Sequence, residues 1–206
     1  MENVKLLFQL YFRPAWAMSE IIDKGSWLFA AATVLLISIA FYSTVNSKLQ
    51  TAYATPNFYE FYQPDFNVGE NSSESAQYDR ALADYQKAMT KRQTVPVVGD
   101  SFFRFFSFEP GGFFQPLLSL SIFYVPVAIF LMCLFGGAGN FGLILRRDYG
   151  TLAVCSLMAW AAAHLPFALA GFALSSLEIS PPIYFSMWLA SSVLFGVLMV
   201  FALRVV

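Results

Sequence analysis

The 206-residue chain contains few charged residues, since Asp, Glu, Lys and Arg together make up only 12% of it. Soluble domains usually carry about 25% charged residues, so this sequence lacks the groups that a water-facing surface of its size needs. The net charge of -1 also provides no basic surface for nucleic acid. These shortages argue against a nucleic-acid binder, a disordered chain and an ordinary cytosolic enzyme.

Histidine and cysteine are also scarce. His164 is the single histidine, and the two cysteines, Cys133 and Cys155, both lie in apolar runs. One histidine cannot supply a structural zinc site or a histidine-based catalytic cluster, and cysteines in apolar runs form no extramembrane disulfide framework. The sequence has no Gly-Lys-Ser phosphate-binding loop, so we expect no catalytic residues, no cofactor, no metal and no bound nucleotide.

Long apolar stretches are what the sequence does contain. A helix needs about 20 apolar residues to span about 30 Å of hydrocarbon. Four stretches without Asp, Glu, Lys or Arg meet this length, running from Trp27 to Val45, Pro116 to Phe135, Thr151 to Leu174 and Ile183 to Leu203. The sequence therefore predicts an all-α integral membrane protein with four transmembrane helices, the last three forming a bundle over residues 116–206.

The distribution of basic residues predicts the orientation of the chain. Short cytoplasmic segments of membrane proteins are enriched in Lys and Arg. With a cytoplasmic N-terminus and four spans, six basic residues lie on the cytoplasmic side: Lys5, Arg13, Lys24, Arg146, Arg147 and Arg204. The segment between the third and fourth spans has no basic residue. We therefore expect both ends of this chain to lie in the cytoplasm.

Residues 1–26 form a cytoplasmic lead that predicts two short amphipathic helices. Leu6, Leu7 and Leu10 recur at helical spacing. Pro14 suits the first turn of a second helix, and Gly25 suits its end. Two arrangements remain open: the helices lie on the membrane surface, or they pack under the bundle.

Residues 46–115 form a long segment that we expect on the extracytoplasmic side, and its first part is rich in aromatic residues. Within it, residues 72–92 predict an amphipathic helix with one apolar stripe. This stripe consists of Tyr78, Leu82, Tyr85 and Met89. We favour packing of the stripe on its own domain or on the membrane surface, and docking on a partner subunit is the alternative.

A phenylalanine-rich stretch over residues 101–114 follows this helix. It is too short and too charged to span a membrane, so we interpret it as an interfacial segment that contacts membrane or a partner. Its leading aromatic residues are Phe102, Phe103, Phe105 and Phe106.

After the second span comes a glycine-rich loop, predicted over residues 136–150 on the cytoplasmic side. Its distinguishing residues are Gly136, Gly137, Gly139 and Phe141. No strand precedes it, so it is not a dinucleotide-binding fingerprint. A helix-ending turn and a place where helices or lipid headgroups approach the backbone are both open interpretations.

His164 is the ionisable residue within the predicted spans, and such residues mark functional sites by default. A neutral imidazole, hydrogen-bonded to a neighbouring helix, is the favoured structural interpretation. Ligation of a haem or pigment is the functional alternative. Two residues later, Pro166 is expected to kink the third span and to free backbone carbonyls nearby.

Three sequence features together resemble the Yip-domain family, whose eukaryotic members interact with Ypt/Rab GTPases. They are Arg13-Pro14 before an amphipathic turn, Gly136-Gly137 followed by Phe141, and a small-residue third span interrupted at Pro166. The resemblance implies five spans, so a fifth would follow Val206. Its bacterial branch implies an inner-membrane protein whose partners are lipid and other integral membrane subunits, for example an exporter assembly.

From these features we expect a non-enzymatic accessory or scaffold subunit of a larger inner-membrane complex. A small transporter or lipid-handling protein with a pocket near His164 and Pro166 is one alternative. A subunit that carries haem or pigment on His164 is another.

Overall fold

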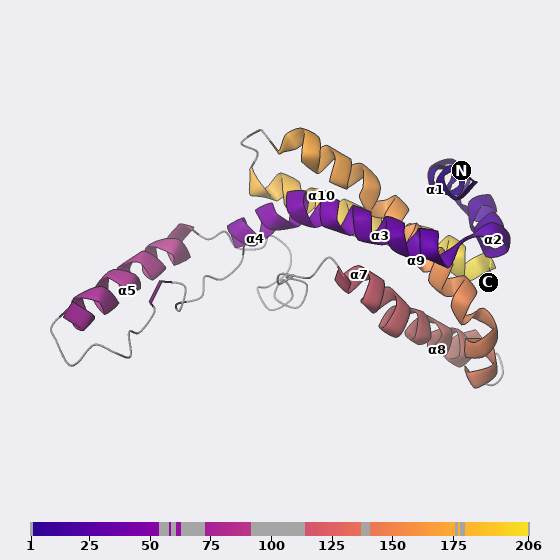
Figure 1. Cartoon of the computed structure of the whole chain (residues 1–206). Helices are drawn as coiled ribbons and strands as arrows, with labels where there is room; N and C mark the ends of the chain where they lie inside the picture. Colours follow the sequence, from indigo (N-terminus) through magenta and orange to yellow (C-terminus); the bar gives the residue numbers. More distant parts are fainter. Residues whose placement is uncertain are drawn as a thin grey trace. The chain divides into compact units, whose positions relative to one another are not determined.

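The computed structural model describes residues 2–53, 58, 61–62, 73–91, 114–136, 141–175, 177 and 180–205. Within these residues every regular element is helical, which confirms the all-α prediction (Figure 1). The chain divides into a larger unit, Met1–Lys48 with Phe108–Val206, and a smaller unit, Leu49–Ser107.

Eleven helical segments are described, two of them π-helical turns labelled η. In chain order they are α1 (Glu2–Phe12), α2 (Pro14–Lys24), α3 (Trp27–Phe41), η1 (Tyr42–Asn46), α4 (Ser47–Tyr53), α5 (Ser73–Lys91), α7 (Gln115–Leu118), η4 (Ser119–Tyr124), α8 (Val125–Gly136), α9 (Phe141–Leu174) and α10 (Pro181–Val205).

Four continuous helices are long and apolar enough to cross a membrane, as the sequence predicted. They run over Trp27–Leu49, Gln115–Leu134, Phe141–Leu174 and Pro181–Val205. Two of them contain π-helical turns, η1 in the first and η4 in the second. The described elements therefore support a multi-pass membrane protein.

The third of these helices begins earlier than the sequence predicted. Residues 141–150, assigned to a loop over residues 136–150, are the first turns of α9. Leu143–Tyr149 contains no proline or glycine, and the Tyr149 hydroxyl donates to the Ser121 carbonyl at 2.9 Å, which ties these turns to the second span. A helix of 34 residues is about 51 Å long, so it can extend beyond the hydrocarbon. Charge ends an apolar stretch but does not end a helix.

α9 is the central helix of the larger unit, because it contacts α1, α2, α3, α8 and α10. From Leu152 to His164 nearly every side chain of α9 is buried, whichever way it points. Three consecutive alanines, Ala161–Ala163, are fully enclosed. Small side chains let neighbouring helices approach closely in a membrane, so this composition explains why α9 occupies the centre.

The two predicted lead helices are present as α1 and α2, and they pack against the bundle. Pro14 occupies the first turn of α2, and the Gly25 amide, just after its end, donates to the Ile21 carbonyl at 2.8 Å. Leu6, Leu7 and Leu10 are buried, and α1 and α2 both contact α9. The contacts therefore support packing on the bundle, the second of the two arrangements open from the sequence.

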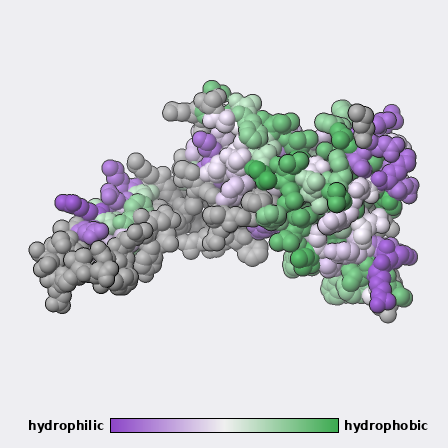
Figure 2. All heavy atoms as spheres, in the orientation of Figure 1, coloured by the Kyte–Doolittle hydropathy of each residue, from purple (hydrophilic) through white to green (hydrophobic). Residues whose placement is uncertain are grey.

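Hydrophilic side chains of the larger unit gather mostly at one end. Figure 2 shows them at the end where Figure 1 places α1, α2, the start of α9 and the C-terminus. The elements at this end carry the six basic residues on which the predicted orientation depends: Lys5, Arg13, Lys24, Arg146, Arg147 and Arg204. A polar end of this kind suits the interface between the membrane and water.

Candidate functional site

Pro166 creates an open hydrogen-bond acceptor within α9. A proline has no amide hydrogen, so the carbonyl four residues earlier, that of Ala162, loses its helical donor. The Tyr11 hydroxyl of α1 donates to this carbonyl. The pKa of Tyr11 is raised to about 12 because burial disfavours the ionised phenol. The hydrogen bond from Tyr11 to the carbonyl left open by Pro166 therefore fixes α1 against α9.

His164 lies in α9 two residues before Pro166, and aromatic rings pack against its imidazole. Its ring stacks on Trp160 with the ring centroids 4.0 Å apart, and Phe41 of α3 meets it edge-on at 5.0 Å. Its Nδ1 atom lies 2.9 Å from the Trp160 carbonyl, so Nδ1 carries the hydrogen and donates. The hydrogen bond stays within α9, so the predicted bond to a neighbouring helix is wrong. The i, i+4 geometry of the helix supplies the nearer acceptor.

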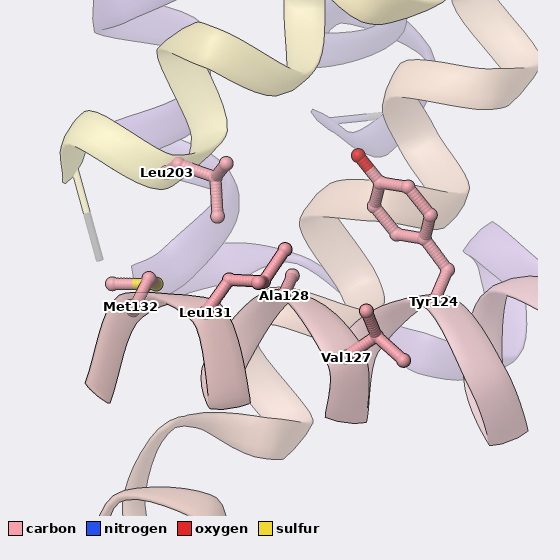
Figure 3. Close-up of a pocket in the computed structure, with 6 residues that line it drawn as sticks. All are labelled: Tyr124, Val127, Ala128, Leu131, Met132 and Leu203. Carbon is pink, nitrogen blue, oxygen red and sulfur yellow. The ribbon is translucent and has the colours of Figure 1, made fainter. Parts of the chain in front are cut away.

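The described cavity lies elsewhere, between the second and fourth spans. It has a volume of about 340 Å³ and is lined by Tyr124, Val127, Ala128, Leu131, Met132 and Leu203. Figure 3 shows the α8 residues in a row, with Leu203 of α10 above Met132 at one end and the upright Tyr124 ring at the other. Neither His164 nor Pro166 lines this cavity. Sequence reasoning missed it because its lining is apolar and carries no chemical signature.

The first span and α9 meet very closely at Gly171. A Cβ atom on Gly171 would lie 2.6 Å from Thr44 Oγ1 and 2.8 Å from Thr44 Cβ. Thr44 belongs to η1, and its hydroxyl donates to the Ala40 carbonyl at 2.8 Å. The close approach therefore depends on Gly171 having no side chain. The facing Thr44 side chain is held in place by its hydrogen bond to Ala40.

The apolar stripe of the predicted outer helix is found on α5, in the smaller unit. Phe58 contacts Tyr78 and Tyr85 with ring centroids 5.6 Å apart in both pairs, and Tyr62 contacts Tyr78 at 5.4 Å. The stripe therefore packs in part on its own unit. Leu82 and Met89 are half-buried, and Tyr78 remains 44% exposed.

The remaining predicted site residues are placed only in part. Gly136 is the last residue of α8 and Phe141 is the first residue of α9, where its ring contacts Phe130 with the centroids 6.1 Å apart. The other residues singled out in these two segments lie outside the described residues: Gly137, Gly139, Phe102, Phe103, Phe105 and Phe106.

Comparison with known proteins gives no relative for this chain: no family model, no curated protein and no solved structure matches it.

Proposed function

We propose that the chain is a non-enzymatic accessory or scaffold subunit of a larger complex in a bacterial inner membrane, with a cytoplasmic N-terminus. The Yip-domain resemblance, carried by Arg13-Pro14, Gly136-Gly137 and Pro166, is part of this proposal. Its partners are other integral membrane subunits and lipid.

The observation that carries the proposal is the incomplete cover over α5. Among the side chains of α5 that the structure describes, Ala81 is the buried one, at 5% exposed. Helices of this length gain most of their stability from packing of an apolar face. The aromatic rings of Phe58, Phe61 and Tyr62 cover only part of that face. A partner surface over the stripe completes the packing.

The surroundings of His164 favour a packing role for this residue. Trp160 and Phe41 lie against the ring, and the side chain is only 7% exposed. These contacts lend no support to a transport pocket at His164 and Pro166 or to a pigment-carrying subunit.

The test is site-specific photo-crosslinking in native membranes. A photoreactive amino acid replaces Leu82 or Met89 on the stripe, and the matched control replaces Lys87, an exposed residue on the opposite side of α5. We expect the stripe positions to crosslink to another polypeptide and the Lys87 position to crosslink far less. Crosslinks to lipid alone from the stripe, or equal crosslinking from all three positions, would contradict the proposal.

A further inference from the structure

We propose that the cavity between α8 and α10 binds an acyl chain of an anionic phospholipid, whose headgroup pairs with Arg204. This lipid site goes beyond the proposed function, and its test does not depend on whether the chain has a partner subunit.

The lining of the cavity matches an acyl chain. Five of the six lining residues are apolar, and the sixth, Tyr124, places an aromatic ring at one end. Val127 and Leu131 are 38% and 44% exposed, so the cavity opens at the side of the bundle, whereas Ala128 is 8% exposed. An opening of this kind, on helices long and apolar enough to cross a membrane, faces the hydrocarbon.

The dimensions of the cavity favour a narrow occupant. An α-helix with its side chains is about 10–12 Å wide, which is too wide to enter a cavity of about 340 Å³. The lining residues from Tyr124 to Met132 extend about 12 Å along the helix axis. A flexible hydrocarbon chain would fill a cavity of this length, whereas a helix would lie over the cavity and leave it empty.

The charge at one end of the cavity specifies an anionic headgroup. Arg204 follows the lining residue Leu203 in the last turn of α10 and is exposed. In the described part of the chain, Arg147 pairs with Asp148 at 2.8 Å and Lys24 with Glu20 at 2.6 Å, whereas no carboxylate lies within ion-pair distance of Arg204. Basic residues beside grooves between transmembrane helices bind anionic lipid headgroups, and the long arginine side chain can reach the interface.

The test is native mass spectrometry of the full chain released from nanodiscs of phosphatidylglycerol and phosphatidylcholine. Leu131→Trp fills the cavity from an exposed position, and Ala128→Phe fills it from a buried one. The matched control for Leu131→Trp is Leu189→Trp, at a residue of α10 that is also 44% exposed but does not line the cavity. Loss of contact with a few methylene groups predicts about tenfold less retained lipid for both filling variants and no change for Leu189→Trp.

The headgroup is tested with Arg204→Gln, and Arg13→Gln removes an exposed arginine from the same polar end as the control. We expect Arg204→Gln to lower the preference for phosphatidylglycerol about fivefold, while Arg13→Gln leaves it unchanged. If Leu131→Trp and Leu189→Trp retain equal lipid, or both arginine variants behave alike, the proposal is wrong. It is also wrong if a photoreactive residue at Leu131 crosslinks to a protein chain and not to phospholipid, because a helix then covers the groove.

Discussion

At the residue scale, the most informative contact joins Tyr11 to the carbonyl that Pro166 leaves open. The sequence predicts the open carbonyl, because the missing amide of a proline within a helix is a local property. It does not predict the donor, which lies 151 residues away and depends on how α1 packs on α9. A proline within a buried helix is tolerated here because another element satisfies the acceptor.

A double-mutant cycle tests this contact. Tyr11→Phe removes the hydroxyl and is expected to lower the free energy of unfolding by about 1 kcal/mol. Pro166→Ala restores an amide hydrogen for the Ala162 carbonyl, so in that background Tyr11→Phe should cost clearly less. The free energies come from reversible unfolding in detergent micelles. Equal costs in the two backgrounds would show that the hydroxyl does not serve this carbonyl.

The pH dependence of the same contact follows from the pKa of Tyr11, which burial raises from 10.0 to about 12. The folded state holds the phenol proton more tightly than the unfolded state, so the stabilisation is fully present below pH 10 and is lost as the pH rises through 12. The ionised phenol also cannot donate to Ala162. We expect the stability difference between wild type and Tyr11→Phe to stay constant up to pH 10 and to shrink between pH 10 and 12. A constant difference over the whole range contradicts this assignment.

Gly171 offers a second test at single-residue resolution. Gly171→Ala places a methyl group 2.6 Å from Thr44 Oγ1, which the Ala40 carbonyl holds in place. Overpacking of this kind costs about 1–3 kcal/mol, and we expect a matching loss of unfolding free energy. Gly196→Ala is the control, because nothing lies within 4 Å of its added Cβ. It should be neutral or slightly stabilising, since alanine favours helix. Equal effects of the two substitutions would disprove the close approach.

At the scale of elements, the helices that periodicity and end signals mark could be predicted well. Pro14 and Gly25 predict the limits of α2, and the predicted helix over residues 72–92 is α5, Ser73–Lys91. The start of α9 was missed because apolarity was taken as the measure of helix length, although Arg146, Arg147 and Asp148 continue the helix. The turns η1 and η4 could not be predicted, because no local sequence pattern marks where a helix changes to the i→i+5 hydrogen bonds of a π-helical turn.

The aromatic contacts of α5 predict how its stability is distributed. Phe58 contacts Tyr62, Tyr78 and Tyr85, whereas Phe61 contacts Tyr85 alone among the described rings. Each aromatic pair contributes about 0.5–1.5 kcal/mol. Phe58→Ala should therefore speed amide hydrogen exchange across α5 about tenfold or more, and Phe61→Ala should have a smaller effect. Similar exchange rates in the two variants would mean that Phe58 does not hold the helix.

At the scale of the whole molecule, the membrane class follows from composition, whereas the candidate sites depend on tertiary structure. Four apolar stretches predict four potential transmembrane spans, and the low content of charged residues argues against a soluble fold. The cavity beside Leu203 arises because α8 and α10 do not close fully around Ala128, and no single segment records such a gap. The proposed subunit role likewise depends on the apolar stripe of α5 that its own unit covers only in part.

The most direct test of this role is the mass of the protein extracted gently from its native membrane. In native mass spectrometry from a mild detergent, the chain should appear in an assembly that contains at least one different polypeptide. Tyr85→Asp, on the stripe of α5, should release that polypeptide, and Ala83→Asp, at an exposed position away from the stripe, should not. A lone chain that carries only lipid, in several mild detergents, would contradict the subunit role.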